Sequence, residues 1–384
     1  MPWLAPIFIM SWKNYPLKKL HIELSSYCNA ACPLCPRFVS NSPNIRKDLD
    51  QTQISFAKFQ QYFPFEIIEG LDKILYCGTM GDPITNKDII HIVDYVTEIN
   101  PNCEQVIHTN GGIRSKEFWH KLGTIFNTEN RKVTFSIDGL SDTNHLYRRN
   151  VSWNKLMQNS ESFINAGGHA RWEFLVFKHN EHQIDQAREL SDEMGFKLFL
   201  DKKPFGFVNY SNNTAMNRDV FDKYGDVTHQ LKPSTISKYN DQLPLGNHKE
   251  LYRETKLTKT TIDTLGSYVN ELDANTISCA SFENSTSELY VNSKGYVFPC
   301  CYVGTSYDGN IDNYLDYQIK TSINNNVELI DLNKKNIVEI IDEGIIDRLF
   351  SSQWNKKVCD GKIGFCSQTC GKKNPIDKIY VHSV

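Results

Sequence analysis

The first 200 residues alternate short apolar runs with longer amphipathic stretches. The runs have the length of strands and are rich in β-branched and aromatic residues; they cover residues 18–25, 73–78, 104–109, 132–138, 171–177 and 196–201. The stretches between them, such as residues 86–100 and 181–195, have helical spacing, and the second ends on Gly195 as helices often do. Repeated strand-helix units give parallel strands with right-handed crossovers. The pattern therefore predicts an α/β fold, a partial (β/α)6 TIM-like barrel.

The pattern changes after the sixth strand. A polar stretch is followed by alternating residues typical of a hairpin, with Ser293-Lys294-Gly295 at the turn, and then by a helical pattern over residues 336–354. A further helical stretch is expected near residues 251–272. We therefore expect three parts: the barrel over residues 1–205, a bridging segment over 206–275, and a small cysteine-rich α+β domain, hairpin plus helix, over 276–384.

Composition argues against membrane and nucleic-acid proteins. No apolar run approaches the ~18 residues of a membrane span, and the apolar start, residues 1–10, lacks the basic residues and the cleavage pattern of a signal peptide. We expect that start to pack against the body. The formal net charge of −3 provides no overall positive field for nucleic acid. We therefore expect a cytoplasmic protein.

The eleven cysteines are the unusual feature. Disulfides are rare where thiols stay reduced, so cysteines in such a chain more often bind metal or do chemistry. An early group contains Cys28, Cys32 and Cys35; a late group contains Cys279, Cys300, Cys301, Cys359, Cys366 and Cys370; Cys77 and Cys103 stand apart. Two metal-binding regions are predicted.

The early group, in "YCNAACPLCPR", directly follows the first predicted strand and so lies on the functional face of a barrel. A closed zinc site needs four ligands, and no nearby residue completes this one. Iron-sulfur clusters are held by cysteine thiolates, and a four-iron cluster with three protein ligands leaves one iron open for another molecule. The spacing favours this open cluster.

The segment "CNAACPLC" resembles the cluster-binding loop of the radical S-adenosylmethionine (radical SAM) superfamily, and four further motifs follow in that family's order. They are "GDP", "HTNGG", "SIDG" and "YRRN". Each motif alone is also an ordinary turn or surface sequence; their joint order favours the family. The resemblance implies a first 4Fe-4S cluster on Cys28, Cys32 and Cys35.

The resemblance also implies which residues contact S-adenosylmethionine (SAM). They are Gly81, Asp82 and Pro83 at the methionine amino group, Thr109 and Asn110 after the third strand, Ser136 and Asp138 near the ribose, Arg148 or Arg149 at the methionine carboxylate, and Leu34 at the adenine. Two residues depart from the family: Leu34 stands where an aromatic residue is usual, and Asp82 replaces a glutamate.

The late group resembles the SPASM and Twitch extensions of this superfamily, which hold auxiliary iron-sulfur clusters and open with a hairpin like "GYVFPCC". Too few cysteines remain for two fully ligated clusters, so the shorter Twitch form, with one auxiliary 4Fe-4S cluster, fits better. The resemblance implies Cys279, Cys300 and Cys370 as ligands, with Cys366 preferred to Cys359 as the fourth. Cys301 is expected to face away from Cys300. A zinc site on the same cysteines is the alternative.

The resemblance implies an enzyme that reductively cleaves SAM to a 5'-deoxyadenosyl radical, which takes hydrogen from an unactivated carbon. Its electron donor would be a protein such as flavodoxin or ferredoxin, and the auxiliary cluster would aid oxidation or bind substrate. Cys77 is a candidate hydrogen-atom donor at the mouth of the barrel, and Lys178 and His179 are candidate substrate contacts.

The substrate stays open between a peptide and a small molecule. About twenty residues precede the first predicted strand, so we expect no leader-binding domain there, which slightly favours a small molecule. A third hypothesis is a non-catalytic metal protein that binds nucleic acid or a partner through the basic tail, residues 361–378. The overall charge argues against nucleic acid.

Overall fold

The computed structural model describes residues 10–39, 42–204, 207–209, 214–215, 217–240, 266–309 and 314–371. Three predicted features lie wholly or partly outside the described residues: the apolar start, most of the helix expected near 251–272, and the end of the basic tail. In the described part, no helix is long and apolar enough to cross a membrane.

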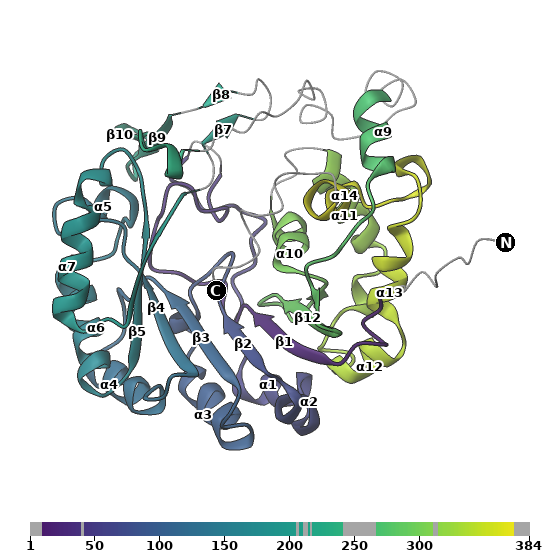
Figure 1. The fold of residues 1–384 in the computed structure, drawn as a ribbon, viewed down its shortest axis with the longest axis horizontal. Coiled ribbons are helices and arrows are strands. Elements are labelled where there is room, and N and C mark those ends of the chain that lie inside the picture. The colour runs from purple at the N-terminus through teal and green to yellow at the C-terminus, as the bar shows by residue number, and fades with distance from the viewer. Residues whose placement is uncertain are drawn as a thin grey trace.

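A curved, mostly parallel sheet forms the frame of the molecule (Figure 1). Its strands follow the order β11-β12-β1-β2-β3-β4-β5-β6, with β13 paired to β12. Neighbours are parallel from β12 to β6. The strands are β1 (Leu17–Ile22), β2 (Lys73–Tyr76), β3 (Glu104–Thr109), β4 (Arg131–Ser136), β5 (His169–Leu175), β6 (Leu198–Lys202), β11 (Phe282–Glu283), β12 (Thr286–Val291) and β13 (Val297–Phe298). The sheet is a partial barrel, as the sequence predicts.

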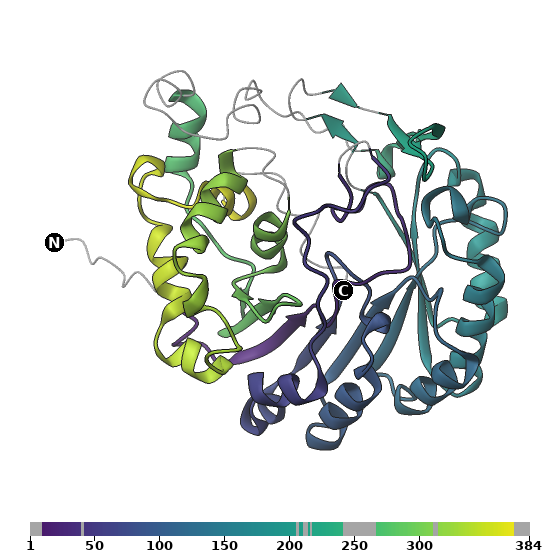
Figure 2. The same cartoon turned by 180° about the vertical axis from the view of Figure 1, so that it is seen from behind.

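Helices of the first half lie on the outer, convex side of this sheet (Figures 1 and 2). They are α1 (Phe56–Tyr62), α2 (Phe65–Gly70), α3 (Ile89–Ile99), α4 (Lys116–Ile125), α5 (Asn144–Tyr147), α6 (Trp153–Asn165) and α7 (Ile184–Met194), with short 3₁₀ turns η1 (Pro83–Thr85) and η2 (Glu181–Gln183). The α7 helix ends at Gly195, whose φ of 86° is left-handed, so the predicted helix end is confirmed.

The C-terminal helices gather on the side of β12 (Figure 1). They are α9 (Gly266–Ala274), α10 (Cys301–Asp308), α11 (Tyr314–Asn324), α12 (Ile337–Asp342), α13 (Ile345–Leu349) and α14 (Gly364–Cys370), with 3₁₀ turns η4 (Val327–Leu329), η5 (Ser351–Gln353) and η6 (Val358–Asp360). The single helix predicted over residues 336–354 is wrong. Gly344, at φ 62°, breaks it between α12 and α13 because the left-handed conformation cannot continue a right-handed helix.

The bridging segment contains short antiparallel pairs that the sequence did not predict. These are β7 (Val208–Asn209) with β8 (Thr214–Ala215), and β9 (Arg218–Phe221) with β10 (Val227–Leu231), followed by the 3₁₀ turn η3 (Ser237–Tyr239). Both pairs lie above the carboxyl ends of the barrel strands (Figure 1). They therefore border the face where a barrel places its functional residues.

The two faces of the sheet differ in polarity because side chains alternate along each strand. On β5, Ala170, Trp172 and Phe174 are fully buried on the helix side. Arg171 and Glu173, on the concave side, remain partly exposed. The apolar core therefore lies between the sheet and its helices, and the inner face is free for polar chemistry.

The predicted hairpin is present as β12 and β13. Its first strand, β12, also pairs with a strand of the barrel. β12 pairs in parallel with β1, from Leu17 opposite Ser287 to Ile22 opposite Val291. The C-terminal hairpin therefore extends the barrel sheet on the edge next to the cysteine loop.

Candidate cluster and cofactor site

Cys28, Cys32 and Cys35 lie in the loop that leaves β1 at the carboxyl edge of the sheet. Two backbone bonds shape this loop: the N–H of Cys35 donates to the carbonyl of Cys32 at 3.0 Å, and the N–H of Ala31 donates to the carbonyl of Arg149 at 2.9 Å. The loop is therefore held both by its own turn and by the segment after α5.

Arg37 braces the same loop from inside. Its side chain is only 2% exposed, and its Nη1 donates to the carbonyls of Cys28 at 3.3 Å and Ala30 at 3.4 Å. Its Nε is buried and finds no hydrogen-bond partner among the described residues. A buried guanidinium with an unused donor beside three thiols suits an anionic group between them.

Burial raises the pKa of the three thiols, to about 12 for Cys28 and about 11 for Cys35, and upward for Cys32. The charge of Cys32 raises the pKa of both others, so the three sulfurs share one environment. Metal binding therefore has to displace protons from these thiols.

Two side chains from other segments, one just after β3 and one just after α5, point donors at the sulfurs. The Nδ2 of Asn110 lies 3.6 Å from the Sγ of Cys28, and the Nη1 of Arg148 lies 3.7 Å from the Sγ of Cys32. Donors of this kind stabilise thiolate ligands and tune the metal group that they hold. Three converging thiols with such donors fit a cluster held by three cysteines.

Asp82 forms the centre of the polar network beside this loop. Its Oδ2 accepts from the Thr109 hydroxyl at 3.0 Å and from Asn110, through the backbone N–H at 2.8 Å and Nδ2 at 2.6 Å. Its Oδ1 accepts from the N–H of Ile84 at 3.0 Å. Burial raises its pKa although these donors oppose the shift. Asp82 thus fixes the two residues that the sequence predicts at the cofactor, and Oδ1 keeps a free lone pair.

Gly81 and Pro83 flank Asp82, and packing requires the glycine. A Cβ on Gly81 would lie 1.9 Å from the carbonyl oxygen of Ser25, so only glycine fits against the start of the cysteine loop. Pro83 is buried at the first position of η1, where a missing N–H costs nothing. The "GDP" residues therefore connect the end of β2 to the cysteine loop.

The structure separates Arg148 from Arg149. Nε of Arg148 donates to the Oδ2 of Asp138 at 2.5 Å, and this ion pair holds the pKa of Arg148 well above its ordinary value although burial opposes it. Asp138 has no exposed surface, and its Oδ1 accepts from the N–H of Leu175 at 2.6 Å. In this arrangement Asp138 holds the guanidinium of Arg148 next to the Sγ of Cys32.

Arg149 turns the other way and lines a cavity of about 860 Å³. Its guanidinium donates to the carbonyl of Phe221 on β9. Leu34 and Cys35 line the same cavity from the cysteine loop, and Cys301 and Tyr302 line it from α10. The cavity thus opens beside the early cysteines and is closed by the C-terminal part.

Ser136 and Cys77 lie on the concave side of the sheet, at the ends of β4 and β2. Burial and the carboxylate of Glu173 raise the pKa of Cys77 to about 12, so its thiol keeps its hydrogen at neutral pH. Glu173 pairs with Lys202 at 2.9 Å and lies 3.8 Å from Nδ1 of His108. These side chains make a charged inner layer below the cysteine loop.

Lys178 and His179 lie on the loop after β5. Lys178 is exposed and pairs with Glu181 at 2.6 Å. His179 stacks on Phe177 with 5.2 Å between ring centroids. Neither residue lines the cavity, so a role in substrate binding stays a prediction.

Four of the late cysteines share a second environment. A hydrogen bond with Cys370, together with burial, raises the pKa of Cys279, and Cys300 and Cys366 raise it further. Burial also raises the pKa of Cys366, and Cys300 and Cys370 add to that shift. Cys359 is exposed on η6 and takes no part in these interactions. The structure thus groups Cys366, and not Cys359, with Cys279, Cys300 and Cys370.

The indole N–H of Trp354 lies against the Cys366 thiol and lowers its pKa, yet within the described part of the chain it makes no hydrogen bond of ordinary geometry. Burial raises the pKa of Cys300, and the backbone N–H groups of Val303 and Tyr302 oppose this rise. Four thiols with a spare donor suit a four-thiolate centre. Among the described residues, no three potential ligands of the early or the late group lie close enough to hold a single metal ion, so neither group is a preformed one-metal site such as a zinc site.

Cys301 directly follows Cys300, at the start of α10, and its charge adds to the rise in the pKa of Cys300, so its expected orientation away from Cys300 stays a prediction. It lines the cavity, and burial, Glu288 and Cys77 raise the pKa of its thiol to about 12. Among residues important to the site, sequence reasoning missed Arg37, although it directly follows Cys35-Pro36. A basic residue beside a cysteine triplet was the available signal.

No protein-family model matches this chain. In sequence it is similar to the molybdenum cofactor biosynthesis protein moc-5 of Caenorhabditis elegans, with 25% identity over 237 residues, which is 60% of this chain and 38% of that protein. The chain therefore spans well under half of this curated relative.

Two solved structures show partial structural similarity to this chain. SuiB of Streptococcus suis bound to S-adenosylmethionine has a TM-score of 0.45 and 16% identity, over 77% of this chain and 61% of that one. The enzyme anSMEcpe, with bound AdoMet and Cp18Cys peptide, has a TM-score of 0.49 and 15% identity, over 93% of this chain and 89% of that one.

Proposed function

We propose that this chain is a radical SAM enzyme that holds a 4Fe-4S cluster on Cys28, Cys32 and Cys35. When bound, the reduced cluster supplies the electron that cleaves SAM and yields a 5'-deoxyadenosyl radical able to take hydrogen from carbon. The observation that carries the proposal is a group of three neighbouring thiols, Cys32 among them buried, with the donors of Asn110 and Arg148 directed at two of the sulfurs.

The chain's own residues position the reactants and exclude water. Asp82 holds Asn110 against Cys28, and Asp138 holds Arg148 against Cys32. The remaining N–H groups of Arg148 suit a carboxylate, because a guanidinium binds planar anions with two parallel bonds. We assign the methionine carboxylate to Arg148, and we assign Arg149 to the substrate cavity that it lines.

The second group would hold one auxiliary 4Fe-4S cluster on Cys279, Cys300, Cys366 and Cys370. Four thiolates complete such a cluster, so this centre would carry electrons or order the substrate wall without an open iron. Its first helix, α10, lines the substrate cavity through Cys301 and Tyr302. This contact supports a role close to the substrate, which would be a peptide side chain or a small molecule inside the cavity.

The test is anaerobic reconstitution with iron and sulfide, followed by incubation with SAM and a strong reductant. We expect 5'-deoxyadenosine from the wild type and none from the triple variant in which Cys28, Cys32 and Cys35 become Ala. Equal amounts from both proteins would overturn the proposal. We also expect about eight irons per chain; about four would remove the auxiliary cluster, and zinc in their place would support the alternative site.

A further inference from the structure

Glu23, the residue directly after β1, is buried where the sequence offers no obvious reason for a carboxylate. Its side chain is 1% exposed. Its Oε1 accepts from the backbone N–H of Met80 at 2.6 Å, and its Oε2 accepts from the Tyr290 hydroxyl at 3.1 Å and, more loosely, from the Thr79 hydroxyl at 3.4 Å. One buried carboxylate thus joins β1, the loop after β2 and the C-terminal hairpin.

The loop that Glu23 holds leads directly to Asp82. It is tightly packed: a Cβ on Gly78 would lie 2.3 Å from the carbonyl oxygen of Gly81. The hydroxyls of Thr79 and Tyr290 also lie 3.0 Å apart, which closes a triangle with Glu23. A loop with glycine at both ends has little stiffness of its own, so these bonds determine its conformation.

Tyr290 brings the auxiliary part of the chain into this triangle. It lies on β12, and its ring packs against His21 with 4.9 Å between ring centroids. A Cβ on Gly304 would lie 2.2 Å from this ring, so α10 sits directly on it. The helix that begins directly after Cys300 therefore rests on the tyrosine that supports the loop before Asp82.

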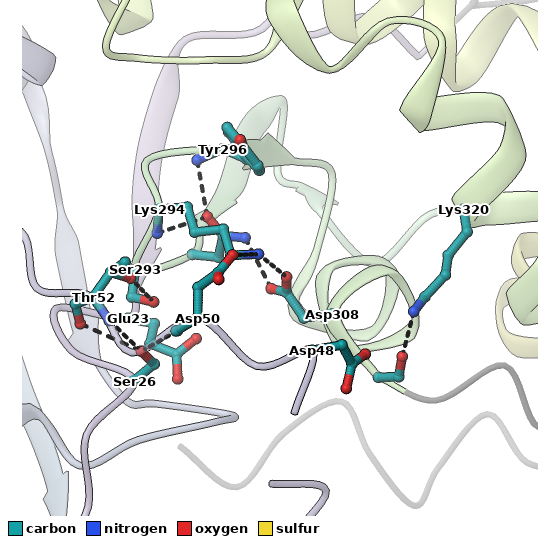
Figure 3. Close-up of polar contacts among 12 residues, drawn as sticks. Glu23, Ser26, Asp48, Asp50, Thr52, Ser293, Lys294, Tyr296, Asp308 and Lys320 are labelled. Carbon is teal, nitrogen blue, oxygen red and sulfur yellow. Dashed lines mark hydrogen bonds and ion pairs between the residues drawn. The ribbon is translucent and has the colours of Figure 1, made fainter. Parts of the chain in front are cut away.

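A second contact fixes the hairpin turn to the far end of the cysteine loop (Figure 3). The Nζ of Lys294 lies 3.0 Å from Asp50 and 3.9 Å from Asp308, so the turn bridges the cysteine loop and α10. Thr52 donates to the hydroxyl of Ser293 at 2.9 Å. The hairpin thus contacts the early cysteine loop through its turn, and it contacts Glu23 at the start of that loop through Tyr290.

We propose that Glu23, Thr79 and Tyr290 are positioning residues that hold residues 78–82 in the conformation that binds the methionine end of SAM. The inference rests on the proposed function and deepens it: the affinity for SAM at the first site depends on a hydroxyl supplied by the C-terminal hairpin. Preorganising a loop in its bound form strengthens binding because the ordering cost is removed from the binding step.

The protonation state of Glu23 is coupled to its hydrogen bonds with this loop. All of its partners are donors, so the ionised carboxylate satisfies Met80, Thr79 and Tyr290 at once. Burial raises its pKa to about 7, and nearby Asp308 acts in the same direction. Cys77 and Tyr290 are the other titratable groups that face it. Because the packed loop holds this pKa above that of an exposed carboxyl, ionisation of Glu23 favours release of the loop, and the loop should be held best below about pH 7.

The test measures SAM affinity of the reconstituted protein by titration, through calorimetry and the electron paramagnetic resonance spectrum of the reduced cluster. We expect Tyr290→Phe and Glu23→Gln each to weaken SAM binding about tenfold, with iron content unchanged. Wild-type affinity should weaken as the pH rises through about 7, because the ionised carboxylate is less stable in the packed loop, and Glu23→Gln should reduce this dependence.

Tyr76→Phe is the matched control. It removes a buried hydroxyl whose 3.0 Å bond goes to Gln105 on the helix side of the sheet, so it should lower stability without changing SAM affinity. Thr79→Val and Thr79→Ser provide a second pair that leaves the core intact. Weaker SAM binding in Thr79→Val, together with wild-type binding in Thr79→Ser, would support the proposal.

The outcomes separate this inference from the proposed function. Wild-type binding of SAM with affinities within about twofold in Tyr290→Phe, Glu23→Gln and Thr79→Val would overturn the inference alone. A weakening in Tyr76→Phe equal to that in Tyr290→Phe would also overturn it, because the effect would then be general loss of stability. A wild type that holds iron but binds no SAM would overturn both.

Discussion

The two cysteine groups of this chain differ in their number of thiols and in what surrounds them. The early group has three thiols and receives side-chain donors from Asn110 and Arg148. The late group has four thiols, and its surroundings include the backbone N–H groups at the start of α10 and the ring of Trp354. An open site needs polar residues for its missing ligand; a complete one needs little beyond its thiols.

The residues that surround the two cysteine groups also come from different parts of the fold. The early group is surrounded by residues from the ends of several parallel strands, which is where a barrel gathers its functional side chains. The late group is built from helix ends and a hairpin, in a part of the molecule that the barrel does not organise. Since Tyr290 and Lys294 link the two, they are separate centres in one packed unit.

The largest expected effect concerns the fourth thiol of the late group. Cys366→Ser should remove the auxiliary cluster and leave about four irons per chain, because one of its four thiolates is lost. Cys359→Ser is the matched control and should keep about eight, since Cys359 is exposed and apart from the others. Iron analysis with Mössbauer spectroscopy measures both. Loss of iron in Cys359→Ser alone would reverse the assignment of the fourth ligand.

A change at Asp82 should affect only the early group. Asp82→Ala leaves the buried donors of Thr109, Asn110 and Ile84 without an acceptor, so we expect a loss of about 3 kcal/mol in stability and about 100-fold in SAM cleavage. The auxiliary iron should remain. Denaturant unfolding and 5'-deoxyadenosine formation measure the two effects.

Asp347→Ala is the control for that experiment. Asp347 also accepts several hydrogen bonds, from Ser11, the N–H of Trp12 and Ser351, but it lies on α13 and bonds to none of the residues around the early group. It should cost stability and leave SAM cleavage close to the wild type. Equal loss of cleavage in both variants would show that the Asp82 effect is not local.

The polar shell of the early group should also give the fold a distinct pH dependence. Burial raises the pKa of Glu23 from 4.5 to about 7, so the folded state binds a proton more tightly than the unfolded state. This contribution to stability is complete below about pH 4.5 and is lost as the pH rises through about 7. Relative to Glu23→Gln, the wild type should lose about 3 kcal/mol across that window.

Denaturant unfolding of both proteins at a series of pH values measures this difference. His21 and His108, whose pKa values burial lowers to about 4, contribute stability that is lost as the pH falls below 6.5, which is the opposite slope. They are present in both proteins and cancel in the difference. A difference that does not change with pH would contradict the raised pKa of Glu23.

Local patterns were enough to predict the barrel. The six parallel strands and the end of α7 at Gly195 follow from apolar runs and a left-handed cap, which depend on neighbouring residues only. The pairing of β12 with β1 could not be predicted because it joins residues more than 260 positions apart. The break at Gly344 was missed because a glycine inside a helical pattern signals a break only when its φ is known to be positive.

The candidate site divides in the same way. Motif order was enough to predict Asp82 and Asn110 beside the cysteines. It could not distinguish Arg148 from Arg149, because adjacent residues after a short helix point in opposite directions and only the fold determines which one meets Asp138. Nor could it find Glu23, whose role depends on a tyrosine from the other end of the chain.

The smallest expected effect concerns the surroundings of the late group. Trp354 presents a buried N–H to Cys366 that makes no ordinary hydrogen bond within the described residues, and its ring packs on Trp12 and Phe282. Trp354→Phe keeps an aromatic ring and removes the N–H. Since donors to cluster sulfurs stabilise the reduced, more negative state, the auxiliary potential should fall by roughly 40 mV, which corresponds to about 1 kcal/mol for one electron. Protein-film voltammetry measures it, with the potential of the early cluster as internal control: a shift of both potentials, or of neither, would contradict a local bond from Trp354 to the late group.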